Sequence, residues 1–252
     1  MDPLSGPVGI ITGGLSGIGA AAAVEFARLR ASLVLADVAT DDRQGVTTQV
    51  KALGGMATIA ECDVTDYDSV QRLVDETVAE FGRLDFLVAN AGIAEQSRIV
   101  SGDPATWAKV VETNVLGTMH SLRAALPTMR ERRQGHILII ASTSGREPYV
   151  GEPSYLASKW ALVGLAHSLR LEAAEYGVRV TVIEPGSVDT PLTRGSPVVR
   201  RWLEQIRPLD PEDVARALTF AYQQPPHVVI SELVLRSLDE PLNGVTKPVR
   251  RE

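Results

Sequence analysis

Seven short apolar runs recur along the chain, separated by longer stretches in which apolar residues follow helical spacing. The runs cover residues 8–12, 32–36, 57–62, 84–89, 136–141, 178–183 and 228–236. Within each run the apolar positions are consecutive more often than alternate, which is typical of strands that are buried on both faces. Each run therefore predicts one strand of an internal sheet.

The stretches between these runs predict helices. Helical spacing is clearest over residues 18–30, 68–82, 104–130 and 154–176. Strands that alternate with helices form right-handed βαβ units, which place helices on both faces of a parallel sheet. We therefore expect an α/β protein with one doubly wound, Rossmann-type domain over residues 1–252 and a seven-stranded, mostly parallel sheet.

Two segments depart from this alternation. Residues 186–211 contain four prolines and follow the sixth predicted strand, at the sheet edge where open α/β folds bind ligands. We expect this segment to be irregular and to cover a substrate. The polar residues 241–252 are expected to form a loose C-terminal tail.

Composition narrows the class of protein. The chain has 252 residues, of which 44% are hydrophobic and 22% charged, and its net charge of −6 argues against a nucleic-acid-binding face. The apolar runs are too short for a membrane span, and the first residues lack a signal-peptide pattern. The single cysteine and the scattered histidines predict neither a disulfide nor a metal site. These features favour a cytoplasmic protein with no nucleic-acid or membrane partner.

A glycine-rich loop follows the first predicted strand and precedes a helix. Thr12, Gly13, Gly17 and Gly19 lie in it. Glycines let the backbone turn sharply and bring a pyrophosphate against the N-terminus of the helix. A plain tight turn is the alternative, and it is less favoured because the second strand ends at Asp37, where dinucleotide-binding folds place an acid that binds the ribose. The alternative role for Asp37 is to cap the helix that follows.

Asp37 also bears on the choice of cofactor. A carboxylate there accepts a hydrogen bond from a free 2′-hydroxyl and repels a 2′-phosphate. The glycine loop carries Leu15 at a position where a cation would hold that phosphate. The pattern therefore favours NAD, with NADP the less favoured cofactor, and Arg43 is the nearest cation that would weaken this preference.

Polar or turn-forming residues follow the next four strands. They are Asp63 and Val64, Asn90 to Gly92, Ser142, and Pro185 with Gly186. Each is also an ordinary turn former. Because the carboxyl ends of parallel strands share one edge of the sheet, we expect them to lie together at a ligand site.

Two further patterns lie within predicted helices. Asn114 is unfavourable in a helix interior, and its simplest interpretation is an exposed side chain; the alternative is a local break that holds a water molecule. Tyr155 and Lys159 are one helical turn apart, a pair that chance alone explains. The glycines and prolines between Ser142 and Tyr155 predict a loop that brings these two residues together.

In combination, these residues resemble the short-chain dehydrogenase/reductase family, in its ordinary-length branch. The match spans about residues 8–236 and rests on Thr12-Gly13-x-x-x-Gly17-x-Gly19, Asn90-Ala91-Gly92, Asn114, Ser142, Tyr155-x-x-x-Lys159 and Pro185-Gly186-x-x-x-Thr190. The resemblance implies an NAD(P)-dependent oxidoreductase that interconverts a secondary alcohol and its ketone. It also implies a homodimer or homotetramer that pairs through the helices holding Asn114 and Tyr155.

The resemblance implies a role for each matched residue. Tyr155 is the acid/base, Lys159 its partner, Ser142 the group that orients the substrate oxygen, and Asn114 the holder of a water in a proton relay. The residues implied in cofactor binding are Thr12, Gly13, Leu15, Ser16, Gly17, Ile18, Gly19, Asp37, Asp63, Val64, Asn90, Ala91, Gly92, Tyr155, Lys159, Pro185, Gly186, Val188 and Thr190. A free tyrosine has a pKa of about 10, and we expect the Lys159 cation to lower it.

The substrate and the exact activity stay open. The family often has an asparagine where this chain has Ala89, and the C-terminal part is more similar to members that act on small hydroxy acids and amino-acid alcohols. Candidate pocket residues fall in 93–98, 143–151 and 186–207. Five arginines, Arg98, Arg146, Arg194, Arg200 and Arg201, allow a neutral alcohol or a small hydroxy acid. The alternatives are a non-catalytic dinucleotide-binding regulator and an NADP-dependent ketone reductase.

Overall fold

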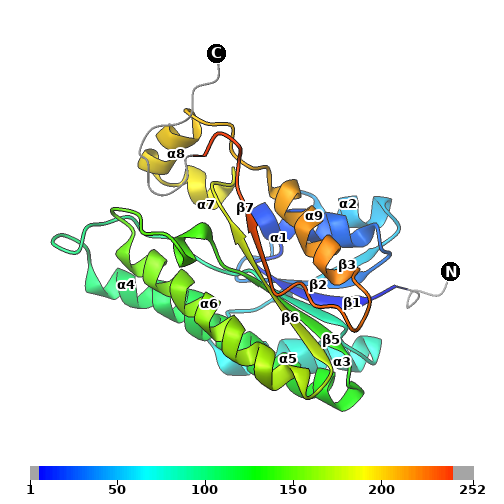
Figure 1. The fold of residues 1–252 in the computed structure, drawn as a ribbon. Coiled ribbons are helices and arrows are strands. Elements are labelled where there is room, and N and C mark those ends of the chain that lie inside the picture. Colours follow the sequence, from blue (N-terminus) through cyan, green and yellow to red (C-terminus); the bar gives the residue numbers. More distant parts are fainter. Residues whose placement is uncertain (1–5, 241–252) are drawn as a thin grey trace.

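The computed structural model describes residues 6–240, so the predicted tail over 241–252 lies outside the described residues. Seven strands form one sheet in the order β3-β2-β1-β4-β5-β6-β7, and every neighbouring pair is parallel (Figure 1). The strands are β1 (Val8–Thr12), β2 (Ser32–Asp37), β3 (Met56–Glu61), β4 (Phe86–Ala89), β5 (Gly135–Ile140), β6 (Val178–Pro185) and β7 (Glu232–Leu235). The predicted doubly wound α/β class is confirmed, with the last strand shorter than expected.

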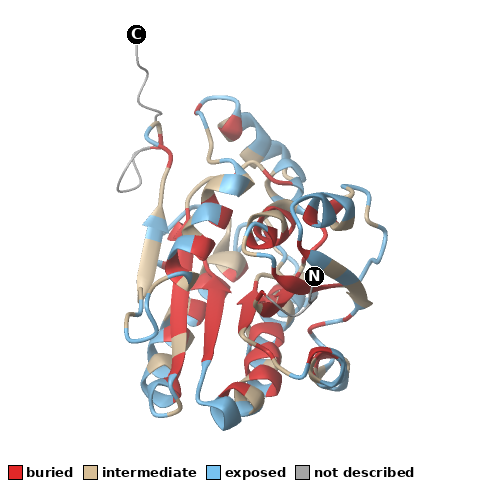
Figure 2. Ribbon diagram, turned by 90° about the vertical axis from the view of Figure 1, so that its right-hand side faces the viewer, coloured by how far each residue is buried: buried red, intermediate tan, exposed pale blue. Residues whose placement is uncertain are grey.

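Helices cover both faces of the sheet (Figure 1). One side carries α3 (Tyr67–Phe81), α4 (Pro104–Val111), α5 (Gly117–Arg132) and α6 (Pro153–Ala174), and the other carries α1 (Gly17–Ala27), α2 (Val46–Ala52) and α9 (Pro211–Tyr222). Successive strand residues enter opposite core clusters, as Ile10 and Ile11 of β1 do. This two-sided burial of the inner strands, visible in Figure 2, is why they are continuously apolar in the sequence, whereas the edge strands β3 and β7 are only partly buried.

The predicted helix over 104–130 is interrupted. After α4 ends at Val111, residues Glu112–Leu116 form a π-helical turn, η1, before α5 continues to Arg132. Such π-helical turns are rare and occur frequently at functional sites.

The segment 186–211 is more regular than predicted. It contains two short helices, α7 (Pro191–Arg194) and α8 (Pro197–Leu203), which begin after the N-caps Thr190 and Ser196. Pro191 and Pro197 open these helices, because proline lacks an N–H that the first helical turn would leave unpaired. Within the described residues, no helix is long and apolar enough to cross a membrane.

Candidate active site

The glycine loop and the end of β4 meet where the strand order reverses, between β1 and β4. Open α/β sheets bind ligands at this crevice. The Asn90 side chain donates from Nδ2 to the carbonyls of Thr12 at 2.9 Å and Gly13 at 3.1 Å. In return, Thr12 Oγ1 accepts from the backbone amides of Asn90 at 3.0 Å and Ala91 at 3.1 Å. These reciprocal bonds fix the glycine loop to β4.

The shape of the glycine loop fits a dinucleotide pyrophosphate. Gly13 and Gly17 adopt positive φ angles of 63° and 51°, which favour glycine. A Cβ atom at Gly19 would lie 2.1 Å from the Gly13 carbonyl oxygen. Helix α1 begins at Gly17, and the side chain of its N-cap, Ser16, forms no capping hydrogen bond. The first amides of the helix are therefore oriented to receive an anion.

Asp37 ends β2 with its carboxylate half-buried, and it accepts a long hydrogen bond of 3.5 Å from Ala39 N. The alternative role of Asp37 as a helix cap is wrong. Asp42 instead accepts from Val46 N at 2.7 Å and Thr47 N at 3.0 Å, at the start of α2. The Asp37 carboxylate therefore stays available at the crevice. Arg43 is occupied by Asp41 at 2.7 Å on the exposed loop.

The other strand ends occupy the same edge in different ways. Asp63 is exposed and accepts from Thr65 N at 2.9 Å and Thr65 Oγ1 at 2.7 Å, as a turn residue does. Val64 is buried against α5. After β6, Gly186 N donates to Leu235 O at 2.7 Å. A Cβ atom at Gly17 would lie 3.3 Å from Thr190, so the segment after β6 adjoins the glycine loop.

Ser142, Tyr155 and Lys159 converge between β5 and α6. Ser142 is the N-cap of η2 (Thr143–Gly145), where its Oγ accepts from Ser144 N at 3.1 Å and donates to Pro185 O at 3.4 Å. The Ser142 side chain lies close enough to the Tyr155 hydroxyl to lower its pKa. Lys159 Nζ lies 5.4 Å from the Tyr155 ring centroid and donates to Ile140 O at 2.9 Å. The three side chains that the sequence predicted to meet do so.

Burial controls the titration of this group. Loss of water around the hydroxyl raises the pKa of Tyr155 to about 12; the hydrogen bond with Ser142 opposes this rise and the Glu152 carboxylate adds to it. Burial also lowers the pKa of Lys159 to about 8. The predicted lowering of the Tyr155 pKa by Lys159 is therefore wrong for the protein alone, because desolvation dominates.

Asn114 is buried, with 1% of its surface exposed, so the simpler expectation of an exposed side chain is wrong. It lies in the π-helical turn η1, and this is the local break considered as the alternative. Its Oδ1 accepts from Ile93 N at 2.8 Å, and its Nδ2 donates to Ile93 O at 2.9 Å and Ser158 Oγ at 3.0 Å. Asn114 therefore connects the loop after β4 to the helix that carries Tyr155.

Sequence reasoning missed the acidic side chains beside Tyr155. Glu152 Oε1 accepts from Gln96 Nε2 at 3.0 Å, and Gln96 in turn contacts Ser196 in the segment after β6. Ser154 Oγ donates to Glu95 Oε2 at 3.3 Å. The position of Glu152, three residues before the tyrosine and so one helical turn away, is the signal that would have found it.

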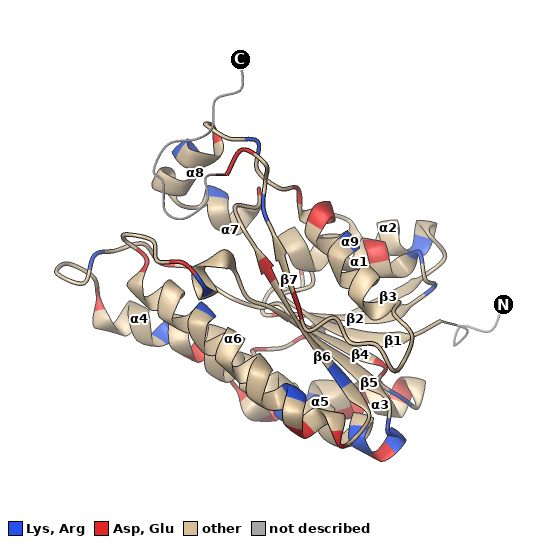
Figure 3. Ribbon diagram, viewed as in Figure 1, with Lys and Arg blue, Asp and Glu red and all other residues tan. Residues whose placement is uncertain are grey.

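The arginines considered for substrate binding are placed differently. Arg146 pairs with the buried Glu184 at 2.5 Å, and Arg194 pairs with Asp189 at 2.5 Å. Arg98, Arg200 and Arg201 are exposed. Figure 3 shows charged residues mainly on helices and loops, while the strands are largely uncharged. Of the charged groups considered, Glu152 is the one that acts on the Tyr155 pKa, and Arg146 and Arg194 are committed to carboxylates.

Known proteins match this architecture along most of the chain. A family model described as short chain dehydrogenase matches residues 7–198. An uncharacterized oxidoreductase of Staphylococcus saprophyticus is 36% identical over 239 residues, covering 94% of this chain and 99% of that protein. A glycine betaine reductase of Emericella nidulans is 35% identical over 245 residues. The match covers 95% of this chain but only 19% of that longer protein.

Solved structures agree with these relatives. A levodione reductase superposes with a TM-score of 0.84 at 28% identity, covering 91% of this chain and 96% of that one. An alcohol dehydrogenase of the archaeon Thermococcus sibiricus, complexed with 5-hydroxy-NADP, superposes with a TM-score of 0.84 at 27% identity. The superposition covers 93% of this chain and 98% of that one. The matched residues, the relatives and the fold together show that the chain belongs to the short-chain dehydrogenase family, a family of NAD(P)-dependent oxidoreductases.

Proposed function

We propose that the protein transfers a hydride between NAD and a secondary alcohol or its ketone, with Tyr155 as the acid/base. The observation that carries the proposal is the convergence of Tyr155, Ser142 and Lys159 beside the crevice between β1 and β4. A non-catalytic regulator would not require these three side chains to meet there.

The cofactor is proposed to lie along the carboxyl edge of the sheet. The amides at the start of α1 hold the pyrophosphate, Asp37 binds the adenosine ribose, and Lys159 with the residues after β6 holds the nicotinamide end. A bound NAD would supply the acceptor for the hydride that leaves the substrate carbon. Asp37 with the apolar Leu15 favours NAD, and the similarity to a structure holding an NADP derivative makes NADP the alternative to measure.

Four side chains have separate roles in the proposed proton transfer. Ser142 Oγ orients the substrate oxygen, and Tyr155 removes its proton during oxidation or returns it during reduction. In the complex, the charges of Lys159 and of oxidised nicotinamide together favour tyrosinate and so oppose the effect of burial on the Tyr155 pKa. Asn114 keeps the loop after β4 in place and positions a water through which the proton reaches solvent.

We propose a neutral or positively charged substrate and not a hydroxy acid. Glu152 acts on Tyr155, Glu95 contacts the preceding residue Ser154, and Arg146 and Arg194 are paired with carboxylates. A substrate carboxylate would meet like charge at this wall, which disfavours its binding. The segment 186–211 covers the substrate in this proposal, since its Ser196 contacts Gln96 beside Glu152.

A matched substrate panel tests the activity and the charge preference together. Butan-2-ol, 3-hydroxybutyrate and 1-aminopropan-2-ol offer the same reacting group with neutral, negative and positive charge. Each is incubated with NAD or NADP while the absorbance of the reduced cofactor is followed. We expect turnover with NAD, faster with the neutral and cationic alcohols than with the acid. Nicotinamide binding without turnover of any alcohol or ketone would support the regulator instead.

The oligomeric state is a separate proposal. Exposed apolar side chains lie along the helices that hold Asn114 and Tyr155; among them are Val111, Leu116, Met119, Trp160 and Leu171. We propose that these faces pair two copies of the chain into a dimer or tetramer. Light scattering after size exclusion measures the mass, and a monomer at micromolar concentration would contradict the pairing.

A further inference from the structure

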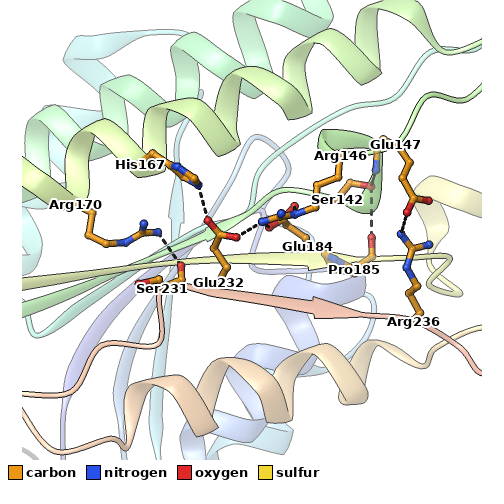
Figure 4. A network of polar contacts seen from close by, with 11 residues as sticks. Ser142, Arg146, Glu147, His167, Arg170, Glu184, Pro185, Ser231, Glu232 and Arg236 are labelled. Carbon is orange, nitrogen blue, oxygen red and sulfur yellow. Dashed lines mark hydrogen bonds and ion pairs between the residues drawn. The ribbon is translucent and has the colours of Figure 1, made fainter. Parts of the chain in front are cut away.

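Ion pairs hold the turn that carries Ser142 to the last two strands. Arg146, at the end of this turn, contacts Glu184 of β6 through Nε–Oε2 at 2.5 Å and Nη2–Oε1 at 2.7 Å. It also reaches Glu232 of β7, as Figure 4 shows. A second pair joins Glu147 to Arg236 at 2.7 Å. Two consecutive residues of the turn, Arg146 and Glu147, are therefore held to the sheet by ion pairs.

Glu184 is an unusual residue for its position. It has no exposed surface, and its neighbours on β6 are apolar. A buried carboxylate is unfavourable unless a cation and hydrogen bonds compensate for its lost hydration. The two-pronged contact from the Arg146 guanidinium supplies both. An apolar residue would serve the core equally well, so the charged pair calls for an explanation beyond packing.

The pair closes a ring of contacts around Ser142. Glu184 directly precedes Pro185, whose carbonyl accepts from Ser142 Oγ at 3.4 Å. Ser142 and Arg146 share one compact turn, in which Gly145 N donates to Ser142 O at 2.8 Å. The Ser142 side chain is thus held to β6 directly and again through Arg146.

The same arginine also connects this turn to the helix that carries Tyr155. Glu232 contacts Arg146 on one side and His167 of α6 on the other, with His167 Nε2 2.5 Å from Glu232 Oε1 (Figure 4). His167 is exposed, so its contact with Glu232 is weaker than the contact of Arg146 with the buried Glu184.

We infer that Arg146 and Glu184 form a positioning pair that fixes Ser142 Oγ relative to the Tyr155 hydroxyl. This inference rests on the proposed function, in which Ser142 orients the substrate oxygen. Neither residue touches the reacting atoms; the pair acts through Ser142.

Kinetics of matched variants separate positioning from general stability. Arg132 offers a control, because it forms a similar half-buried pair with Asp85 at 2.9 Å on the amino side of β4. We expect Arg146→Ala to lower kcat about tenfold, because a small misplacement of a reacting group is costly. Its KM and NAD affinity should stay within about twofold. Arg132→Ala should lower the melting temperature but leave kcat unchanged, and equal kcat in the two variants would contradict the inference.

A double-mutant cycle tests whether Arg146 acts through Ser142. If it does, Arg146→Ala should cost little further kcat in a Ser142→Ala background. If kcat of the double variant instead falls by the product of the two single-variant factors, the inference is wrong. Arg146→Lys, which keeps the charge but not the two-pronged geometry, should restore part of the rate.

Hydrogen exchange gives a readout that needs no substrate. The Ser144 amide donates to Ser142 Oγ at 3.1 Å, so its exchange rate reports the placement of that oxygen. We expect Arg146→Ala to speed this exchange by about tenfold and Arg132→Ala to leave it unchanged. If Arg146→Ala does not fold, Glu184→Gln takes its place in the experiment. This variant removes the buried charge and leaves Arg146 paired with Glu232, and we expect it to speed the exchange of the Ser144 amide to the same extent. Unchanged exchange would overturn the inference, whereas absent turnover in the wild type would count against the proposed function alone.

Discussion

The Tyr155 hydroxyl on α6 lies beside the Ser142 side chain at the end of β5, which lowers its pKa against the effect of burial. The intervening residues fold into the turn η2 and a loop, which return the chain to the same sheet edge. This contact joins a group that is proposed to hold the substrate oxygen to one that is proposed to move its proton.

Replacing Tyr155 by phenylalanine tests the proton step. The variant keeps the ring beside Lys159 but lacks the hydroxyl, so we expect kcat to fall by about 10³-fold. NAD affinity, measured by equilibrium titration, should stay within about twofold, because the amides at the start of α1 are untouched. Substantial remaining turnover would show that another group moves the proton.

Asp37 should control the choice of nucleotide. In the wild type we expect NAD to bind more tightly than NADP, because the carboxylate repels a 2′-phosphate. Asp37→Ser should weaken or reverse the preference for NAD, measured as the ratio of the dissociation constants for NADP and NAD. Glu80→Gln removes one negative charge from an exposed position in α3 and serves as the control. A wild-type protein that prefers NADP would refute this role of Asp37.

Lys159 should make stability depend on pH. Its pKa is about 8 in the folded protein and 10.5 when unperturbed, so the folded state binds fewer protons between these values. Stability therefore rises with pH across this window. Relative to Lys159→Met, the wild type should gain on the order of 2 kcal/mol in unfolding free energy from pH 8 to pH 10. Urea titrations at the two pH values measure the gain, and a constant difference would contradict it.

Asn114 should be important for stability as well as for the site. Asn114→Ala leaves both backbone groups of Ile93 without their side-chain partner, so we expect a loss of about 2–3 kcal/mol. The exposed Glu112 lies in the same π-helical turn, and Glu112→Ala should change stability by less than about 0.5 kcal/mol. Urea denaturation compares the two, and equal losses would argue against the buried bonds.

Much of the fold was predictable because its signals are local. The five inner strands, which are buried on both faces, appear as continuous apolar runs, whereas the edge strands β3 and β7 are only partly buried. Parallel strands also place their carboxyl ends along one edge. Residues after those ends, such as Asn90 and Ser142, could therefore be expected to lie together before any contact was known. The helix α2 was not predicted, because its short stretch contains polar residues and little periodicity.

The order of the elements, the family and the residue types at the site all follow from the amino-acid sequence. Tertiary structure alone decided that Asn114 is buried, that burial raises the Tyr155 pKa, and that Arg146 is committed to Glu184. The physical reason is that desolvation and ion pairing depend on which distant segments enclose a side chain. Glu184 interrupts an apolar strand in the sequence, but its partner is thirty-eight residues away, and only the packing of β5 beside β6 brings the two together.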